Sequence, residues 1–297
     1  MSDTTEASGP RGLWGFWLSR FVVFFVVLAA VYIGCQVGRG ALLRYEPGIP
    51  RNAVLLGEGF AIALLATSAY RLLVRWTEHR SATELGFRGA IPLALGGAAI
   101  GLVLFLAVYA GLFALGVASF AGWGTTENLL AMFAGAFGAA FGEEILMRGG
   151  VFRLLEEGFG TIIAVVLSGA LFGFLHSGNP GATLESSVAI ALEAGVLLAA
   201  AYAVTRSLWL PIGLHFGWNF TEGGIFGEAV SGGASKGGLI HAPLLGPDAL
   251  TGGQFGPEAS IVAVSISFVA SLVMLVLAAQ RGHWKPVRFR LRGAGEA

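Results

Sequence analysis

The sequence predicts an all-α membrane protein, a polytopic helical bundle of about eight transmembrane helices that forms a single membrane domain over residues 1–297. Two observations lead to this fold class. Hydrophobic residues make up 55% of the chain and charged residues only 12%, which is about half the charged share of an average soluble domain. The apolar residues also gather in runs near 20 residues, the length that a helix needs to cross a hydrocarbon core about 30 Å thick.

Eight apolar stretches with polar edges account for most of the chain, and each is expected to be a helix. They cover about residues 15–38, 53–74, 90–118, 127–150, 160–177, 184–204, 208–226 and 259–280. The long connection at about 222–257 is Gly-rich, and we expect a non-helical loop there, either outside the membrane or re-entrant. Polar residues inside the apolar stretches concentrate at about 120–226, which is the expected catalytic core.

The distribution of basic residues predicts the orientation, because Arg and Lys in short loops stay on the cytoplasmic side. With the N-terminus inside, 14 basic residues fall on the cytoplasmic side, and the four on the outer side are Arg39, Arg44, Arg51 and Lys236. Both termini are therefore expected to be cytoplasmic, as a tail at about 1–14 and a basic tail at about 281–297. The basic tail is expected to rest on anionic membrane lipid. The net charge of zero gives no electrostatic case for nucleic acid.

Adjacent carboxylates end the apolar run at 127–150. Charged side chains inside hydrocarbon are costly and are functional candidates by default. Glu143 and Glu144 point about 100° apart on a helix, so they are expected to have different tasks. Arg148 follows Glu144 by four residues, the favourable spacing for an ion pair. We expect Arg148 to orient Glu144 and Glu143 to face the bundle interior as a base, with a structural ion-pair cluster as the alternative.

Two further helices carry residue pairs at a spacing of four, which places both members of a pair on one helix face. The first pair is Phe172 and His176, and the second is His215 and Asn219, in which both members are polar. Taken singly, a histidine on an apolar helix is more often structural than catalytic, and the second pair is consistent with hydrogen bonds between helices. Together with Glu143, they form a hydrolytic arrangement, in which a carboxylate deprotonates water and imidazole and amide groups hold an oxyanion. Glu193 lies in the middle of the next helix, and its expected partner is Arg148 or a motif histidine.

Three motifs in this order resemble those of the CPBP family, the CAAX-processing and bacteriocin-processing proteases that include the Ras-converting CAAX endopeptidase. They are Glu143-Glu144-x-x-x-Arg148, Phe172-x-x-x-His176 and His215-x-x-x-Asn219, and Glu84-Leu85-Gly86-Phe87 matches the flanking sequence. The resemblance implies an intramembrane endopeptidase that acts on a peptide or protein at the membrane. It further implies that Glu143 is the general base, that His176 helps to hold the water, and that His215 and Asn219 stabilise the oxyanion.

A mechanism without a cofactor is favoured, because no H-E-x-x-H pair is present. Zinc stays open as the alternative, since Glu143, His176 and His215 offer one carboxylate and two nitrogens. Two other classes of function also stay open. One is a non-catalytic binding or immunity protein that uses the same cavity. The other is a proton-coupled transporter, although the inverted repeats and broken helices typical of transporters are not found in the sequence.

The depth of the motif residues raises a question. At about 1.5 Å per residue, Glu143 lies roughly 15 Å from Arg153 and His215 roughly 13 Å from Arg206, while His176 lies roughly 22 Å from the start of its helix. Either the helix at 127–150 is longer than its apolar run, or the helix at 160–177 is tilted or begins outside the hydrocarbon. The first two values predict a cavity that opens toward the cytoplasm. The Arg- and Ala-rich composition is typical of a bacterial chain, which places the protein in the inner (plasma) membrane.

Overall fold

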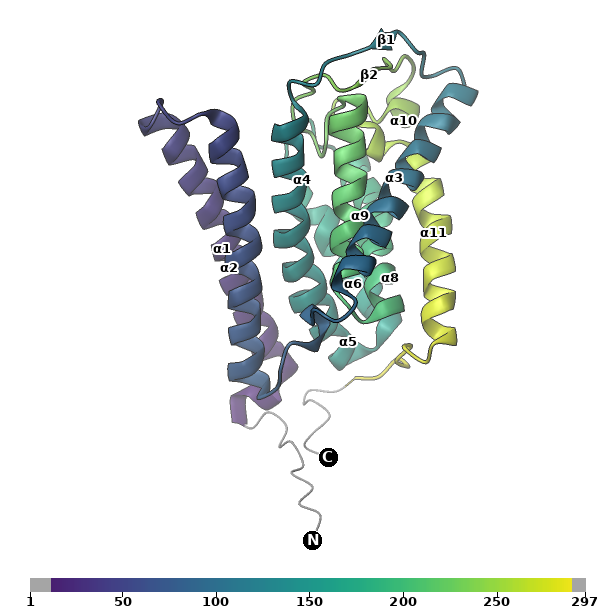
Figure 1. The fold of residues 1–297 in the computed structure, drawn as a ribbon. Coiled ribbons are helices and arrows are strands. Elements are labelled where there is room, and N and C mark those ends of the chain that lie inside the picture. Colours follow the sequence, from purple (N-terminus) through teal and green to yellow (C-terminus); the bar gives the residue numbers. More distant parts are fainter. Residues whose placement is uncertain (1–11, 290–297) are drawn as a thin grey trace.

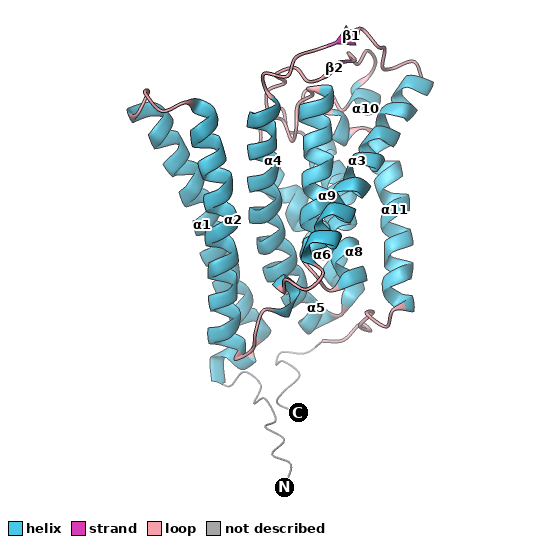
Figure 2. Cartoon of the chain, in the orientation of Figure 1, coloured by secondary structure: helices cyan, strands magenta, loops and turns pink. Residues whose placement is uncertain are grey.

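A computed structural model describes residues 12–289 and shows a bundle that is almost entirely helical (Figures 1 and 2). All eight predicted stretches are helical, which confirms the fold class. The elements in chain order are η1 (Gly12–Gly15), α1 (Trp17–Tyr45), α2 (Arg51–Glu78), η2 (Thr83–Leu85), α3 (Ala90–Ala114), β1 (Gly122–Trp123), α4 (Leu129–Glu144), η3 (Ile145–Phe152), α5 (Arg153–Phe159), α6 (Thr161–His176), α7 (Leu184–Ile190), η4 (Ala191–Val196), α8 (Leu197–Thr205), α9 (Trp209–Phe220), η5 (Thr221–Phe226), β2 (Ile240–His241), α10 (Asp248–Thr251), η6 (Pro257–Ala259) and α11 (Ile261–Gln280).

Several of these elements continue one another as single long helices. The π-helical segment η3 joins α4 to α5, so that one apolar helix runs over Leu129–Phe159. In the same way, η4 joins α7 to α8, and η5 extends α9. Within residues 12–289, six helices are long and apolar enough to cross a membrane, judged by length and composition. They are Trp17–Tyr45, Arg51–Glu78, Ala90–Ala114, Leu129–Phe159, Leu184–Thr205 and Ile261–Gln280.

The two ends of the bundle differ in construction. The start of α1 and the end of α11 lie at one end, and β1, β2 and α10 lie at the other (Figure 1). We call the first the terminal end and the second the loop end. The strands pair antiparallel, with Trp123 opposite Ile240. The Gly-rich segment after α9 is mostly non-helical and folds over the loop end, except that Glu222 to Phe226 belong to η5.

Buried ion pairs close the terminal end of the bundle. Arg153 donates to both oxygens of Glu78 at 2.9 and 2.6 Å, and Arg80 donates to both oxygens of Glu84 at 2.9 Å. Tyr70 also donates to Glu84. Every residue of η3, the segment that immediately precedes Arg153, is also buried.

The described part of the basic C-terminal segment packs against protein. Lys285 pairs with the fully buried carboxylate of Glu156 at 2.9 Å, and its backbone exchanges hydrogen bonds with Thr161. Lys285 therefore neutralises a buried carboxylate. Contact of this segment with lipid stays a prediction. The tail residues 1–11 and 290–297, where we also expected a cytoplasmic location, lie outside the described residues.

Glycines bring α3 and α9 into backbone contact, and this contact orients α9. A Cβ atom added at Gly97 would lie 2.2 Å from the carbonyl oxygen of Leu210, and one at Gly217 would lie 2.2 Å from that of Ala98. Small residues allow this approach between membrane helices. Asn219 follows Gly217 by two residues, about 200° around the helix. The face of α9 that carries Asn219 therefore points away from α3.

Candidate active site

Glu143 lies on α4, near the middle of the Leu129–Phe159 helix. Its Oε1 atom accepts a hydrogen bond from the hydroxyl of Tyr32 on α1 at 3.1 Å. Its Oε2 atom is buried, has no hydrogen-bond partner among residues 12–289, and lies 3.9 Å from Nε2 of His176. One oxygen of this carboxylate is thus held in place, and the other faces an imidazole nitrogen without a direct hydrogen bond.

His176 is the last residue of α6, and its ring is fixed from two sides. Its Nδ1 atom lies 2.8 Å from the carbonyl oxygen of Phe172, and the ring of Phe172 lies 4.5 Å from its own, centroid to centroid. A carbonyl oxygen only accepts hydrogen bonds, so Nδ1 carries the hydrogen. In the neutral ring, Nε2 is then a lone-pair acceptor that faces Glu143.

Glu144 is fully buried and joins two other motif residues. Its Oε1 atom accepts from Arg148 at 3.0 Å, which is the ion pair expected from the spacing, and from Nδ1 of His215 at 2.9 Å. Arg148 also donates to the carbonyl oxygens of Ala194 and Gly195. Its guanidinium carbon lies 4.9 Å from the ring centroid of Phe172. The carboxylate therefore connects α4 to α9 and fixes the imidazole of His215.

All four proposed catalytic residues, namely Glu143, His176, His215 and Asn219, line one cavity of about 750 Å³. Its wall reaches from Phe25 and Met147 to residues near the loop end. The latter are Gln36 and Arg39 of α1, Asn179 and Pro180 after α6, and Val230, Ser231 and Gly233 of the Gly-rich segment. The cavity thus extends from Met147 of η3 toward the loop end. The side on which it opens stays a prediction.

The length of the fourth long helix resolves the question of depth. It ends at Phe159, so Glu143 lies 16 residues, or about 24 Å, from its terminal end, while His176 lies 15 residues, or about 22 Å, from the start of α6. The helix is therefore longer than its apolar run, as the first alternative required. Both residues lie near the middle of the bundle.

A family comparison matches the segment that carries this geometry. Residues 125–221 match the family described as type II CAAX prenyl endopeptidase Rce1-like. The chain carries an Rce1-like domain. The resemblance to the CPBP family is confirmed, and the match includes all three motifs. No curated protein and no solved structure matches the chain significantly.

The Rce1-like domain indicates a CAAX-type protease, and hence peptide or protein substrates at the membrane. Together with the six apolar helices, it identifies an integral membrane protein.

Glu193, expected to support the site, is buried near two of the motif residues. It lines a cavity of about 20 Å³ with His215, Asn219 and Glu258. Within residues 12–289 no ion pair joins it to Arg148 or to a motif histidine, although the charge of Arg148 acts on it at longer range. Arg148 donates its hydrogen bonds to the two carbonyl groups that follow Glu193 in the chain. A role of Glu193 in supporting the site therefore stays a prediction.

Sequence reasoning missed three polar residues near the site. Tyr32 and Glu258 lie outside the Rce1-like domain, and Glu222 follows its last residue. Glu222 accepts from the backbone N–H of Glu258 at 3.3 Å. It follows Asn219 by three residues, so the helical spacing of the third motif would have revealed it. Tyr32 could have been noticed because it lies in the middle of an apolar stretch, whereas tyrosines of membrane helices usually lie near the membrane surface.

The donor atoms of the Rce1-like domain leave zinc as an alternative. Within residues 12–289, no group of three or more His, Cys, Asp and Glu side chains is close enough together to be a metal site as it stands. Glu143 Oε2 and His176 Nε2 lie 3.9 Å apart, and His215 uses Nδ1 for Glu144, which leaves its Nε2 atom unused. Metal-binding histidines commonly donate their other ring nitrogen to a carboxylate, so the contact between His215 and Glu144 does not argue against zinc.

Proposed function

We propose that the protein is an intramembrane endopeptidase that hydrolyses a peptide bond of a membrane-associated protein or peptide with water activated by Glu143. The observation that carries the proposal is the pairing of Glu143 Oε2 with His176 Nε2. Both atoms are hydrogen-bond acceptors, and they lie 3.9 Å apart. A water molecule between them would donate one hydrogen to each and direct its lone pair into the cavity.

The surroundings of Glu143 suit the role of a general base. Tyr32 holds one carboxylate oxygen, so that the other keeps its direction toward His176. The base would take the proton of water as the oxygen attacks the peptide carbonyl, and later release it to the departing amine. His176 would hold the water through Nε2.

His215 and Asn219 would stabilise the negative oxygen that develops on the substrate carbonyl. Glu144 accepts from Nδ1 of His215, which leaves Nε2 as the other nitrogen of the ring. The protonated ring would donate from Nε2, and the Glu144 carboxylate would stabilise that charged form. Donors placed before the reaction in a site that excludes water are a major source of rate enhancement.

We also propose that both termini are cytoplasmic and that the membrane is the bacterial inner membrane. The common end of α1 and α11 and the excess of basic residues on the terminal side support this orientation. Cysteine labelling from each side of sealed vesicles, with single cysteines placed near residues 12 and 289 in a Cys35→Ser background, would test it.

The test of the activity compares wild type with Glu143→Gln and Glu144→Gln. Glu127→Gln is the matched control, because Glu127 is an exposed carboxylate outside the cavity. Each purified protein is incubated with a library of membrane-anchored peptides, with and without a zinc chelator. We expect cleavage by wild type and control, loss in Glu143→Gln, and no effect of the chelator.

The other outcomes discriminate between the alternatives. Cleavage retained in Glu143→Gln would refute its role as the base. Loss on chelation would favour a zinc-dependent reaction. If wild type cleaves no peptide, the non-catalytic binding protein becomes the better explanation.

A further inference from the structure

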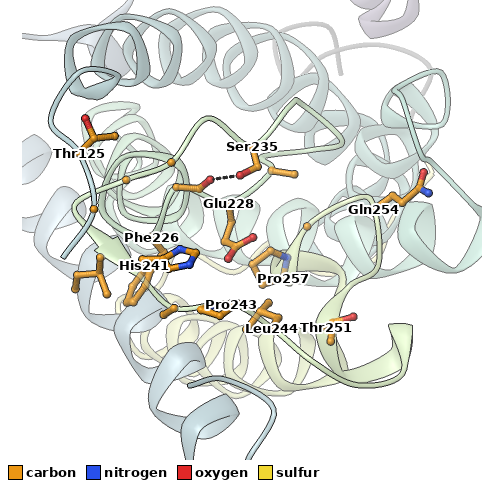
Figure 3. A pocket seen from close by; sticks show the side chains of 18 of the residues that line it. Thr125, Phe226, Glu228, Ser235, His241, Pro243, Leu244, Thr251, Gln254 and Pro257 are labelled. Carbon is orange, nitrogen blue, oxygen red and sulfur yellow. Dashed lines mark hydrogen bonds between the residues drawn. The ribbon is translucent and has the colours of Figure 1, made fainter. Parts of the chain in front are cut away.

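A second large cavity lies at the loop end, separate from the site of the motifs. Its volume is about 850 Å³, within the range usual for small-ligand sites. Figure 3 shows its wall, in which Glu228 lies centrally among His241, Pro243 and Pro257. Apart from Thr125, the lining residues lie outside the segment from 125 to 221, and the proposed function assigns no role to them.

Close backbone packing makes this wall a preformed structure. An added Cβ atom at Gly238 would lie 2.4 Å from the backbone nitrogen of Gly227, and Gly227 has a φ of +71°. Both positions therefore require glycine. The backbone of Thr125 donates to Gly238, and Ser235 donates to the carbonyl oxygen of Gly227 at 2.6 Å. The glycines of this segment thus allow its backbone at Gly227 to pack closely against its backbone at Gly238.

The wall presents two carboxylates and one imidazole. Glu228 and Asp248 contribute the carboxylates, His241 contributes the imidazole, and within residues 12–289 no Lys or Arg lines the cavity. Lys236 lies next to lining residues in the chain but is exposed and is not part of the wall. Phe226 and Trp123 supply aromatic surface. This combination favours a cation with an apolar body, because carboxylates and aromatic faces both attract positive charge.

Glu228 is the more buried of the two carboxylates in the wall, and its hydrogen bond with Tyr109 engages only one of its oxygens. It is half-buried, and its Oε1 atom accepts from the hydroxyl of Tyr109 at 2.9 Å. Burial raises the pKa of the Glu228 carboxyl, against the opposing effects of the Tyr109 hydrogen bond and of His241. A cation beside the carboxylate would relieve this cost of burial. A metal ion is disfavoured, because no group of three suitable ligands exists within residues 12–289.

We propose that this cavity binds an ammonium group at the Glu228 carboxylate, carried either by a lysine-containing peptide segment or by a small free amine. The Gly-rich segment separates it from the motif cavity. Gly227, Glu228 and Ala229 line the loop-end cavity, while Val230, Ser231 and Gly233 line the other. The two cavities share no lining residue, so binding at Glu228 can be measured without the chemistry at Glu143.

The test measures binding in a Glu143→Gln background, so that no peptide is cleaved and the result does not depend on the proposed protease activity. The protein is reconstituted in nanodiscs of uncharged phosphatidylcholine, because anionic lipid would itself bind amines. Isothermal titration uses three probes. They are the peptide acetyl-Gly-Gly-Lys-Gly-Gly-amide, the same peptide with an acetylated lysine side chain, and n-butylamine.

We expect saturable binding of the lysine peptide or of butylamine, and none of the acetylated peptide. Tighter binding of the peptide identifies a peptide segment as the natural source, and equal binding identifies a free amine. Glu228→Gln, which keeps the shape of the side chain, should weaken binding by about tenfold or more. Glu127→Gln, an exposed carboxylate on the same face that does not line the cavity, should leave it unchanged.

Tyr109→Phe separates a loss of binding from a loss of folding. It removes the hydrogen bond to Glu228 but keeps the charge, so binding should persist within about threefold, a change below 1 kcal/mol. The proposal is overturned if no amine binds saturably, if the acetylated peptide binds equally well, or if Glu228→Gln binds as tightly as its parent.

Discussion

His215 donates from Nδ1 to Oε1 of Glu144 at 2.9 Å, although the two residues are 71 positions apart in the chain. The same oxygen accepts from Arg148 at 3.0 Å. A buried carboxylate thus serves two donors, one that neutralises its charge and one that belongs to the proposed oxyanion site. Oε1 of Glu144 therefore joins the first motif to the third through a hydrogen bond.

This connection predicts that Glu144→Gln lowers both stability and activity. Removal of one partner of a buried ion pair costs about 3–5 kcal/mol, because the other charge stays buried alone. The double variant Glu144→Gln/Arg148→Met removes both charges and should recover most of the stability, since an apolar side chain can replace a buried pair. Thermal unfolding in detergent and peptide cleavage measure the two effects. Recovery of full activity in the double variant would show that Glu144 is only structural.

Tyr32→Phe tests the orientation of the proposed base. The change removes the donor to Oε1 of Glu143, and hydrogen bonds to charged groups contribute about 1.5–3 kcal/mol. We expect cleavage to slow by about tenfold or more, and the thermal unfolding temperature to fall because the same hydrogen bond stabilises the fold. Tyr45→Phe is the control, because Tyr45 is on the same helix and is 71% exposed. Equal rates in both variants would contradict the role of Tyr32.

The contact between α3 and α9 predicts opposite effects at two adjacent glycines. In Gly97→Ala, the new methyl group would lie 2.2 Å from a carbonyl oxygen of α9, whereas at Gly96 nothing lies within 4 Å. We expect Gly97→Ala to cost about 1–3 kcal/mol through overpacking, and to reduce activity by displacing His215. Gly96→Ala should be neutral, or more stable by up to about 1 kcal/mol. Unfolding curves of the two variants, compared directly, check this prediction.

The ion pairs at the terminal end predict sensitivity to acid. Burial alone would raise the pKa of Glu84, but the hydrogen bonds from Arg80 and the charges of Arg153 and Arg80 outweigh burial and hold this pKa at about 2. A pKa below the ordinary value of 4.5 for a glutamate means that the ionised form stabilises the folded state above about pH 4.5. This contribution is lost as the pH falls from about 4.5 through 2.

The corresponding experiment follows unfolding between about pH 7 and pH 2 in wild type, Glu84→Gln and the exposed control Glu127→Gln. Glu84→Gln should be less stable at pH 7 and should lose less stability on acidification. Parallel curves for wild type and Glu84→Gln would contradict the assignment of this carboxylate.

The positions of the helices could be predicted because each apolar run ends at charged or helix-breaking residues. The extension of the fourth long helix to Phe159 could not, since it contains Arg153, Glu156 and Glu157, which are polar when considered locally. These charges are neutralised by partners from distant parts of the chain. Arg153 pairs with Glu78, Glu156 with Arg206, and Glu157 with Arg20.

The same distinction applies to the site. The pairing of Arg148 with Glu144 could be predicted from their spacing on one helix. The contacts of Glu144 with His215 and of Glu143 with Tyr32 join different helices and depend on how those helices pack. The hydrogen bonds of Arg148 to the carbonyl oxygens of Ala194 and Gly195 also join different helices, and helical spacing does not reveal them.

The position of Glu143 about 24 Å from one end of its helix has a consequence for which segments such an enzyme would cleave. At that depth, a substrate helix has all its backbone groups hydrogen-bonded within itself. Its carbonyl carbon becomes accessible only if the segment unwinds locally, which exposes polar backbone to hydrocarbon unless the cavity provides partners. Selection among membrane segments would then depend less on side-chain identity than on how easily each helix frays where it meets the cavity.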